Sequence, residues 1–159
     1  MIMFLSSLFF LGLQVVAAHP IDQFKGHWLG PCTENGKPLV KMDLLIQNSL
    51  EKNRLEYVIT YLPPSGNIIE RKYSLTFQDQ NRSQVILDEG NQILFEEMIQ
   101  ENVMFGLLKN GQTLVHSRFE VKSKTMQVHM TAFSERSQHQ TETQDYRPQS
   151  LQNCLLVKQ

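Results

Sequence analysis

The sequence lacks an excess of charge of either sign, and its basic residues form no cluster. Its 15 Lys and Arg side chains stand against 16 Asp and Glu, which gives a formal net charge of −1 over 159 residues. Neutralising nucleic-acid phosphates takes a clustered basic surface, and binding an anionic membrane surface takes a polybasic segment. We therefore expect no nucleic-acid partner and no polybasic attachment to a membrane.

Motifs for catalysis and for metal binding are also missing. The sequence holds no C-x-x-C or H-E-x-x-H pattern, no G-x-S-x-G elbow and no glycine-rich phosphate loop. Glu96 and Glu97 are neighbours on a predicted strand, so they point to opposite faces and are interpreted as a solvated pair. His116 and His129 could share a metal ion or bind haem, but we expect them to face solvent. The sequence thus predicts no enzyme activity, no catalytic residue, no metal and no cofactor.

The N-terminal segment is apolar and uncharged. Residues 1–18 carry no charged side chain, and Val16 and Ala18 place small residues at the two positions that a cut before His19 requires. This pattern is typical of a secretory signal peptide. The alternative, a membrane anchor, would need about 20 apolar residues, and no other segment is long enough to span. We expect a secreted or periplasmic protein whose mature chain, 19–159, is a single domain without a membrane span.

Only two cysteines are present, Cys32 and Cys154, one near each end of the predicted mature chain. An even count in an exported protein predicts a disulfide, and two cysteines allow one pairing within the chain. The alternative is a pair of free thiols with a catalytic or metal-binding role. A disulfide would place the first and last strands side by side, which favours a closed sheet.

Alternating apolar and polar residues dominate the rest of the chain. Short alternating segments, separated by turn residues such as Pro, Gly, Asn and Asp, predict strands within 40–46, 55–61, 73–77, 85–87, 93–99, 103–108, 113–121, 126–134 and 155–157. No convincing helix is found, and the polar stretch 134–149 is interpreted as an exposed loop or edge ribbon. About eight to ten antiparallel strands predict an all-β fold, and an up-and-down β-barrel is favoured over a sandwich because closure removes open edges.

One hairpin can be put in register from the sequence. Pairing segments 113–121 and 126–134 places Phe119 opposite Val128 and keeps polar residues opposite polar ones. A slip of one residue would mix the two kinds of side chain, so this register is favoured.

Gly26 and Trp28 form a Gly-x-Trp pattern that resembles the opening strand of lipocalin-like, calycin-type barrels. The resemblance implies that Trp28 closes one end of the barrel and packs against a basic residue of the last strand, here Lys158. The Thr-Asp-Tyr motif of typical lipocalins is absent, and no amphipathic C-terminal helix is visible. The resemblance therefore extends to the architecture and to no particular subfamily.

A lipocalin-like barrel implies an interior that either holds a ligand or is filled by its own side chains. The residues predicted to line a binding cavity are Tyr57, Tyr61, Tyr73, Phe77, Phe119 and Met130. A cavity of this composition suits a small hydrophobic ligand. The alternative function is a protein-binding module, such as an enzyme inhibitor, that uses the projecting loop Pro63-Pro64-Ser65-Gly66 to contact a protein partner.

Overall fold

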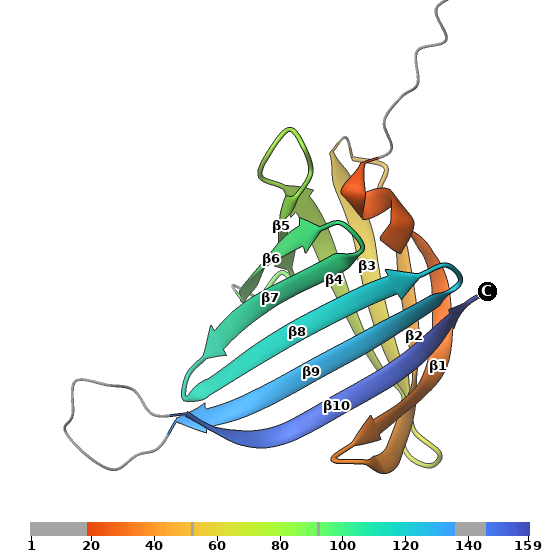
Figure 1. The fold of residues 1–159 in the computed structure, drawn as a ribbon, viewed down its shortest axis with the longest axis vertical. Coiled ribbons are helices and arrows are strands. Elements are labelled where there is room, and N and C mark those ends of the chain that lie inside the picture. Colours follow the sequence, from red (N-terminus) through yellow and green to blue (C-terminus); the bar gives the residue numbers. More distant parts are fainter. Residues whose placement is uncertain (1–18, 52, 92, 136–145) are drawn as a thin grey trace, which may run out of the picture.

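The structure, a computed structural model, describes residues 19–51, 53–91, 93–135 and 146–159. In this part of the chain, ten strands form one closed antiparallel barrel (Figure 1). The prediction of an all-β, up-and-down barrel is confirmed. The predicted signal peptide, 1–18, lies outside the described residues, and export and the domain boundaries stay predictions.

Each strand pairs with its neighbours in chain order, and β1 pairs with β10 to close the barrel. A short 3-10 helix, η1 (Pro20–Phe24), precedes the strands. The strands are β1 (Gly26–Glu34), β2 (Lys37–Asn48), β3 (Arg54–Leu62), β4 (Ile69–Phe77), β5 (Gln84–Asp88), β6 (Leu94–Gln100), β7 (Val103–Asn110), β8 (Thr113–Lys122), β9 (Thr125–Glu135) and β10 (Tyr146–Lys158). The register predicted for the hairpin of β8 and β9 is confirmed, with Phe119 opposite Val128.

The two ends of the barrel sequence are joined covalently. Cys32 on β1 lies directly opposite Cys154 on β10 and forms a disulfide with it, which confirms the predicted pairing. The bond spans 122 positions of sequence. Closing so long a loop restricts the unfolded chain, so the disulfide stabilises the barrel at the seam where its first and last strands meet.

One end of the barrel is filled by apolar side chains. Trp28 is fully buried, and its indole N–H donates to the carbonyl of Phe24 at 2.9 Å. The ammonium nitrogen of Lys158 lies 4.9 Å from the centre of the Trp28 rings, a cation–π contact. Ile21 and Phe24 of η1 are buried beside it, and η1 covers this end (Figure 1). The arrangement that the Gly-x-Trp resemblance implied is thus present, and any open interior space lies further along the barrel.

The last strand begins earlier than predicted. β10 starts at Tyr146, and its polar first residues pair with the end of β9, with Tyr146 opposite Glu135 and Arg147 opposite Ser134. Hydrogen bonds between main chains hold this extension. Of the two interpretations of 134–149, the extended ribbon is therefore the one that fits residues 146–149. Residues 136–145 lie outside the described part. None of the helices among the described residues has the length and apolar character needed to cross a membrane.

Candidate ligand-binding cavity

The barrel interior holds a cavity of about 270 Å³ beyond its filled end. Inward-facing side chains of strands β3 to β9 line it, and most are aromatic or aliphatic. They include Tyr57, Ile59, Tyr61, Tyr73, Leu87, Phe95, Glu97, Val115, Ser117, Phe119 and Met130. Pockets for drug-sized ligands span roughly 300–1,000 Å³. This cavity is slightly smaller, so it suits a compact molecule.

Aromatic rings form one continuous wall of the cavity. Tyr57 lies opposite Tyr73 in the register of β3 and β4, and their ring centres are 5.8 Å apart. Tyr57 also meets Phe119 at 6.3 Å, and Tyr73 meets Phe95 at 5.9 Å. All three contacts are edge-to-face, the arrangement that aromatic quadrupoles favour. These edge-to-face contacts hold the rings in place and so give the cavity a defined shape.

Polar groups lie at the end of the cavity away from Trp28. Arg71 pairs with Glu89 at 2.9 Å, and half of the Arg71 side chain is exposed, which places this ion pair at the mouth. Burial raises the pKa of Tyr61 to about 12. Burial, with a smaller effect of the Glu97 charge, raises the pKa of Tyr57 well above its ordinary value. Both tyrosines therefore present neutral hydroxyl groups to a ligand.

Glu97 is the one acidic side chain, among the residues that the structure describes, that lies deep in this cavity. It is only 4% exposed, so the prediction of a solvated Glu96–Glu97 pair is wrong for Glu97. The Ser117 hydroxyl donates to its Oε1 at 2.9 Å, and its Oε2 is buried without a hydrogen-bond partner among the described residues. Burial raises the pKa of Glu97 to about 7, and the bond from Ser117 opposes that rise.

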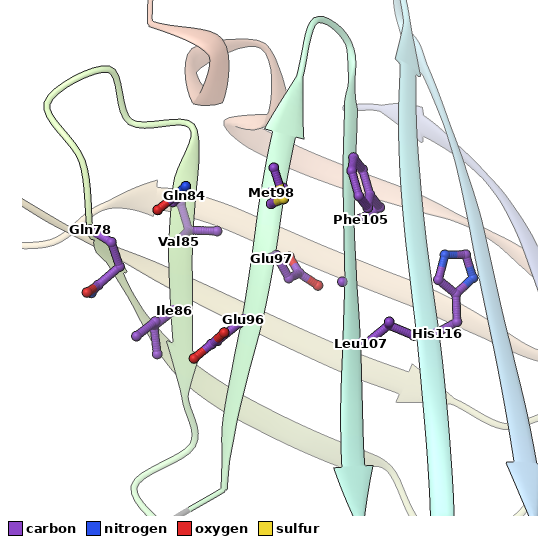
Figure 2. A pocket seen from close by; sticks show the side chains of 11 residues that line it. Gln78, Gln84, Val85, Ile86, Glu96, Glu97, Met98, Phe105, Leu107 and His116 are labelled. Carbon is purple, nitrogen blue, oxygen red and sulfur yellow. The ribbon is translucent and has the colours of Figure 1, made fainter. Parts of the chain in front are cut away.

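Gly106 makes this placement of Glu97 possible. The register puts Glu97 of β6 opposite Gly106 of β7, and Gly106 opposite Ser117 of β8. A Cβ atom on Gly106 would lie 2.6 Å from Cγ of Glu97 and 2.5 Å from the carbonyl oxygen of Glu96. Glu97 therefore crosses β7 through the space that glycine leaves, and Figure 2 shows it reaching from β6 toward β7.

The sequence held a weak signal for this arrangement. On β6, one face carries Phe95 and Ile99 and the other carries Leu94 and Met98, so alternation does not decide which glutamate points inward. A glycine inside a predicted strand marks a close approach of another group. Gly106 could therefore have indicated that a neighbouring side chain crosses its strand.

A second, larger hollow of about 710 Å³ lies on the outer face of β5 to β8 (Figure 2). Most of its lining side chains point away from the barrel interior, among them Ile86, Phe105 and His116, but the buried Val85 and Glu97 also border it. Leu107 is 59% exposed, so this hollow is open to solvent. The interior cavity is the better candidate because aromatic and aliphatic side chains from β3 to β9 surround it, as is typical of small-molecule sites, whereas the outer hollow lies along one face of the sheet.

Comparison with known proteins yields a structural likeness only. No protein-family model and no curated protein matches this sequence. A solved structure described as the S-type phycobiliprotein lyase CPES from Guillardia theta is similar, with a TM-score of 0.63 over 87% of this chain and 90% of that chain. This chain has a lipocalin-like fold. At 8% sequence identity the likeness shows the calycin-type barrel and carries no activity across.

The lipocalin-like barrel brings five of the six predicted ligand-binding residues together. Tyr57, Tyr61, Tyr73, Phe119 and Met130 all line the interior cavity, and binding of a ligand by them stays a prediction. Phe77, the sixth predicted residue, is not among the residues that line this cavity, and a role for it in binding stays a prediction. Its strand ends toward the filled side of the barrel, where the guanidinium carbon of Arg82 lies 4.9 Å from the centre of the Phe77 ring.

The two histidines considered for metal binding have other surroundings in the lipocalin-like barrel. His129 forms a side-chain hydrogen bond with Asn153, and His116 lines the outer hollow. Over residues 19–51, 53–91, 93–135 and 146–159, no group of three or more His, Cys, Asp or Glu side chains is placed to hold a metal ion.

Proposed function

We propose that this protein is an exported, non-enzymatic barrel that binds a small, largely apolar molecule in its interior cavity. The aromatic-walled space of about 270 Å³ inside the barrel carries the proposal. Export rests on the signal-peptide pattern of residues 1–18. Transfer of a compact apolar molecule from water into such a space is favourable because both the ligand and the wall lose contact with water.

The route into the cavity follows from which end is filled. Trp28, Phe24 and Ile21 are fully buried at one end, so a ligand enters past the ion pair of Arg71 and Glu89 at the other. The wall next to that mouth is formed partly by Val115 of β8, which is half-buried and lines the cavity. Enlarging this side chain would fill part of the space that the ligand needs.

The test compares two substitutions at neighbouring positions of β8. Val115→Phe adds an aromatic ring inside the cavity, whereas His116→Phe adds one in the outer hollow. The probe is propylbenzene, a compact hydrocarbon, and its binding is measured by ligand-observed NMR. We expect wild type and His116→Phe to bind equally, and Val115→Phe to bind about tenfold or more weakly. Equal binding by Val115→Phe, or no binding by the wild type, would contradict the proposal.

A second candidate function uses the loop between β3 and β4. Ile68 and Ile69 follow the predicted projecting turn and are 66% and 53% exposed, so they offer apolar surface that a protein partner could cover. A protein-binding barrel such as an enzyme inhibitor would use them. Native mass spectrometry of the protein purified from its source separates the two functions. A small molecule that stays bound to the protein supports ligand binding in the cavity. A bound protein that is lost in the Ile68→Ser variant supports the alternative function.

A further inference from the structure

The interior cavity contains an acceptor that the protein itself does not satisfy. Glu97 is almost fully buried, Ser117 occupies only its Oε1, and Oε2 has no hydrogen-bond partner among the described residues. A buried polar atom without a partner costs free energy, and native proteins seldom retain one without a reason. The apolar surroundings make a ligand that supplies the missing donor the simplest reason.

The charges lining the cavity leave Glu97 unopposed. Among its described lining residues, the charged groups are Arg71, Glu89 and Glu97. Arg71 and Glu89 pair with each other at the mouth, at 2.9 Å, and so balance one another. The interior therefore has an excess of one acidic group, and an anionic ligand would be repelled while a cation would be attracted.

The aromatic wall favours the same sign of charge. Tyr57 stands close enough to Glu97 for the carboxylate to raise its pKa, and it packs against Tyr73 and Phe119. The faces of aromatic rings carry negative electrostatic potential, and they attract organic cations when water is excluded. A carboxylate beside several aromatic rings is a suitable environment for an ammonium group with an apolar body.

We propose that the ligand of this cavity is a compact organic cation, a protonated amine on a small aromatic or aliphatic body, whose ammonium group binds Oε2 of Glu97. The inference rests on the proposed function, because it names the class of molecule that the same cavity accepts. The ammonium group supplies the donor that Oε2 lacks, and the body lies against the wall formed by Tyr57, Tyr73 and Phe119. The volume of about 270 Å³ limits that body to about one ring system.

Ionisation of Glu97 then couples binding to pH. The other titratable groups lining the cavity are Tyr57 and Tyr61 from β3, Arg71 and Tyr73 from β4, and Glu89 at the mouth. The pKa of each of these three tyrosines is raised, so none of them loses its proton near neutral pH. Glu97, with a pKa of about 7, must lose its proton to pair with an ammonium. Amine affinity is therefore expected to rise from about pH 5.5 to about pH 8, by on the order of 10- to 30-fold.

The experiment compares three probes of nearly equal size by isothermal titration calorimetry: phenethylamine, phenethyl alcohol and phenylacetate. We expect the wild type to bind the amine about tenfold or more tightly than the alcohol at about pH 8, and to bind the anion weakest. Glu97→Gln should remove this preference. Glu96→Gln, the same change one residue away on the outer face, is the matched control and should retain it.

Several outcomes would overturn the inference without touching the proposed function. Equal affinity for amine and alcohol in the wild type would do so, as would a preference that survives in Glu97→Gln. A wild-type amine affinity that stays flat over the same pH range would also count against it, and this measurement holds even if the variant does not fold. If propylbenzene still binds in each case and Val115→Phe still weakens it, the cavity is a ligand site of another class.

Discussion

Replacing Glu97 by Gln should change how the stability of the ligand-free barrel depends on pH. The carboxyl group is buried and its pKa is raised from 4.5 to about 7 in the folded protein. Below about pH 4.5 the group is protonated in both the folded and the unfolded chain, so it contributes no pH dependence. Between the two values the unfolded chain releases the proton while the folded chain keeps it. The free energy of unfolding therefore falls as pH rises, and it levels off above about pH 7.

The size of this effect follows from the shift in pKa. Each unit corresponds to about 1.4 kcal/mol, so Glu97 lowers the free energy of unfolding by about 3 kcal/mol between about pH 4 and about pH 8. Glutamine cannot ionise, so the variant should lose this slope. It should therefore gain about 3 kcal/mol relative to the wild type over that range. Any constant cost of placing an amide beside Ser117 cancels, because only the change with pH is compared.

Urea unfolding followed by the fluorescence of Trp28, at intervals across that pH range, measures this difference. Glu96→Gln removes a carboxylate on the outer face of the same strand, and its difference from the wild type should stay within about 0.5 kcal/mol at every pH. If Glu97→Gln minus wild type were equally flat, the buried, proton-retaining state of Glu97 would be refuted.

Three further changes test the parts of the barrel that surround this site. Reduction, or Cys154→Ser, should lower the denaturation midpoint, with a loss of up to about 5 kcal/mol from the chain-entropy model, and an unchanged midpoint would show that the seam does not need its disulfide. Trp28→Ala should cost about 3–5 kcal/mol in chemical denaturation because it empties the filled end, and a near-neutral result would contradict its role there. Gly106→Ala should cost about 1–3 kcal/mol and displace Glu97, since the new Cβ overlaps it; an unaltered Glu97 titration by NMR would show that the carboxylate does not cross that strand.

Much of the fold could be predicted because side chains alternate between the two faces of a strand with a period of two residues. A chain of consecutive antiparallel strands closes into a barrel by pairing its first strand with its last. Alternation located the strands, and the hairpin of β8 and β9 could be put in register because a slip would bury polar residues. The cysteine pairing followed from a count of two. The start of β10 at Tyr146 could not be predicted in this way, because main-chain pairing with β9 depends on what lies alongside and not on the strand's own side chains.

The candidate site was predictable only in part. Tyr57 and Tyr61 share a strand face with the apolar Leu55 and Ile59, and Tyr73 alternates with Lys72 and Ser74, so their inward direction was visible in the sequence. Phe77 has the same alternation but sits at the end of β4, where the barrel interior gives way to the surface around Arg82. Alternation gives the face of a strand on which a residue lies, and it does not give the height along the barrel axis.

The strand order, the closure at Cys32 and Cys154, and the apolar interior could be predicted from the sequence, because each depends on local pattern or on pairing within the chain. The inward direction of Glu97, the room that Gly106 leaves for it and its contact with Ser117 became visible in the folded barrel alone. Those three residues lie on three different strands, and their meeting depends on the register of all three together. The electrostatic character of the cavity follows from that meeting and from no single segment of the sequence.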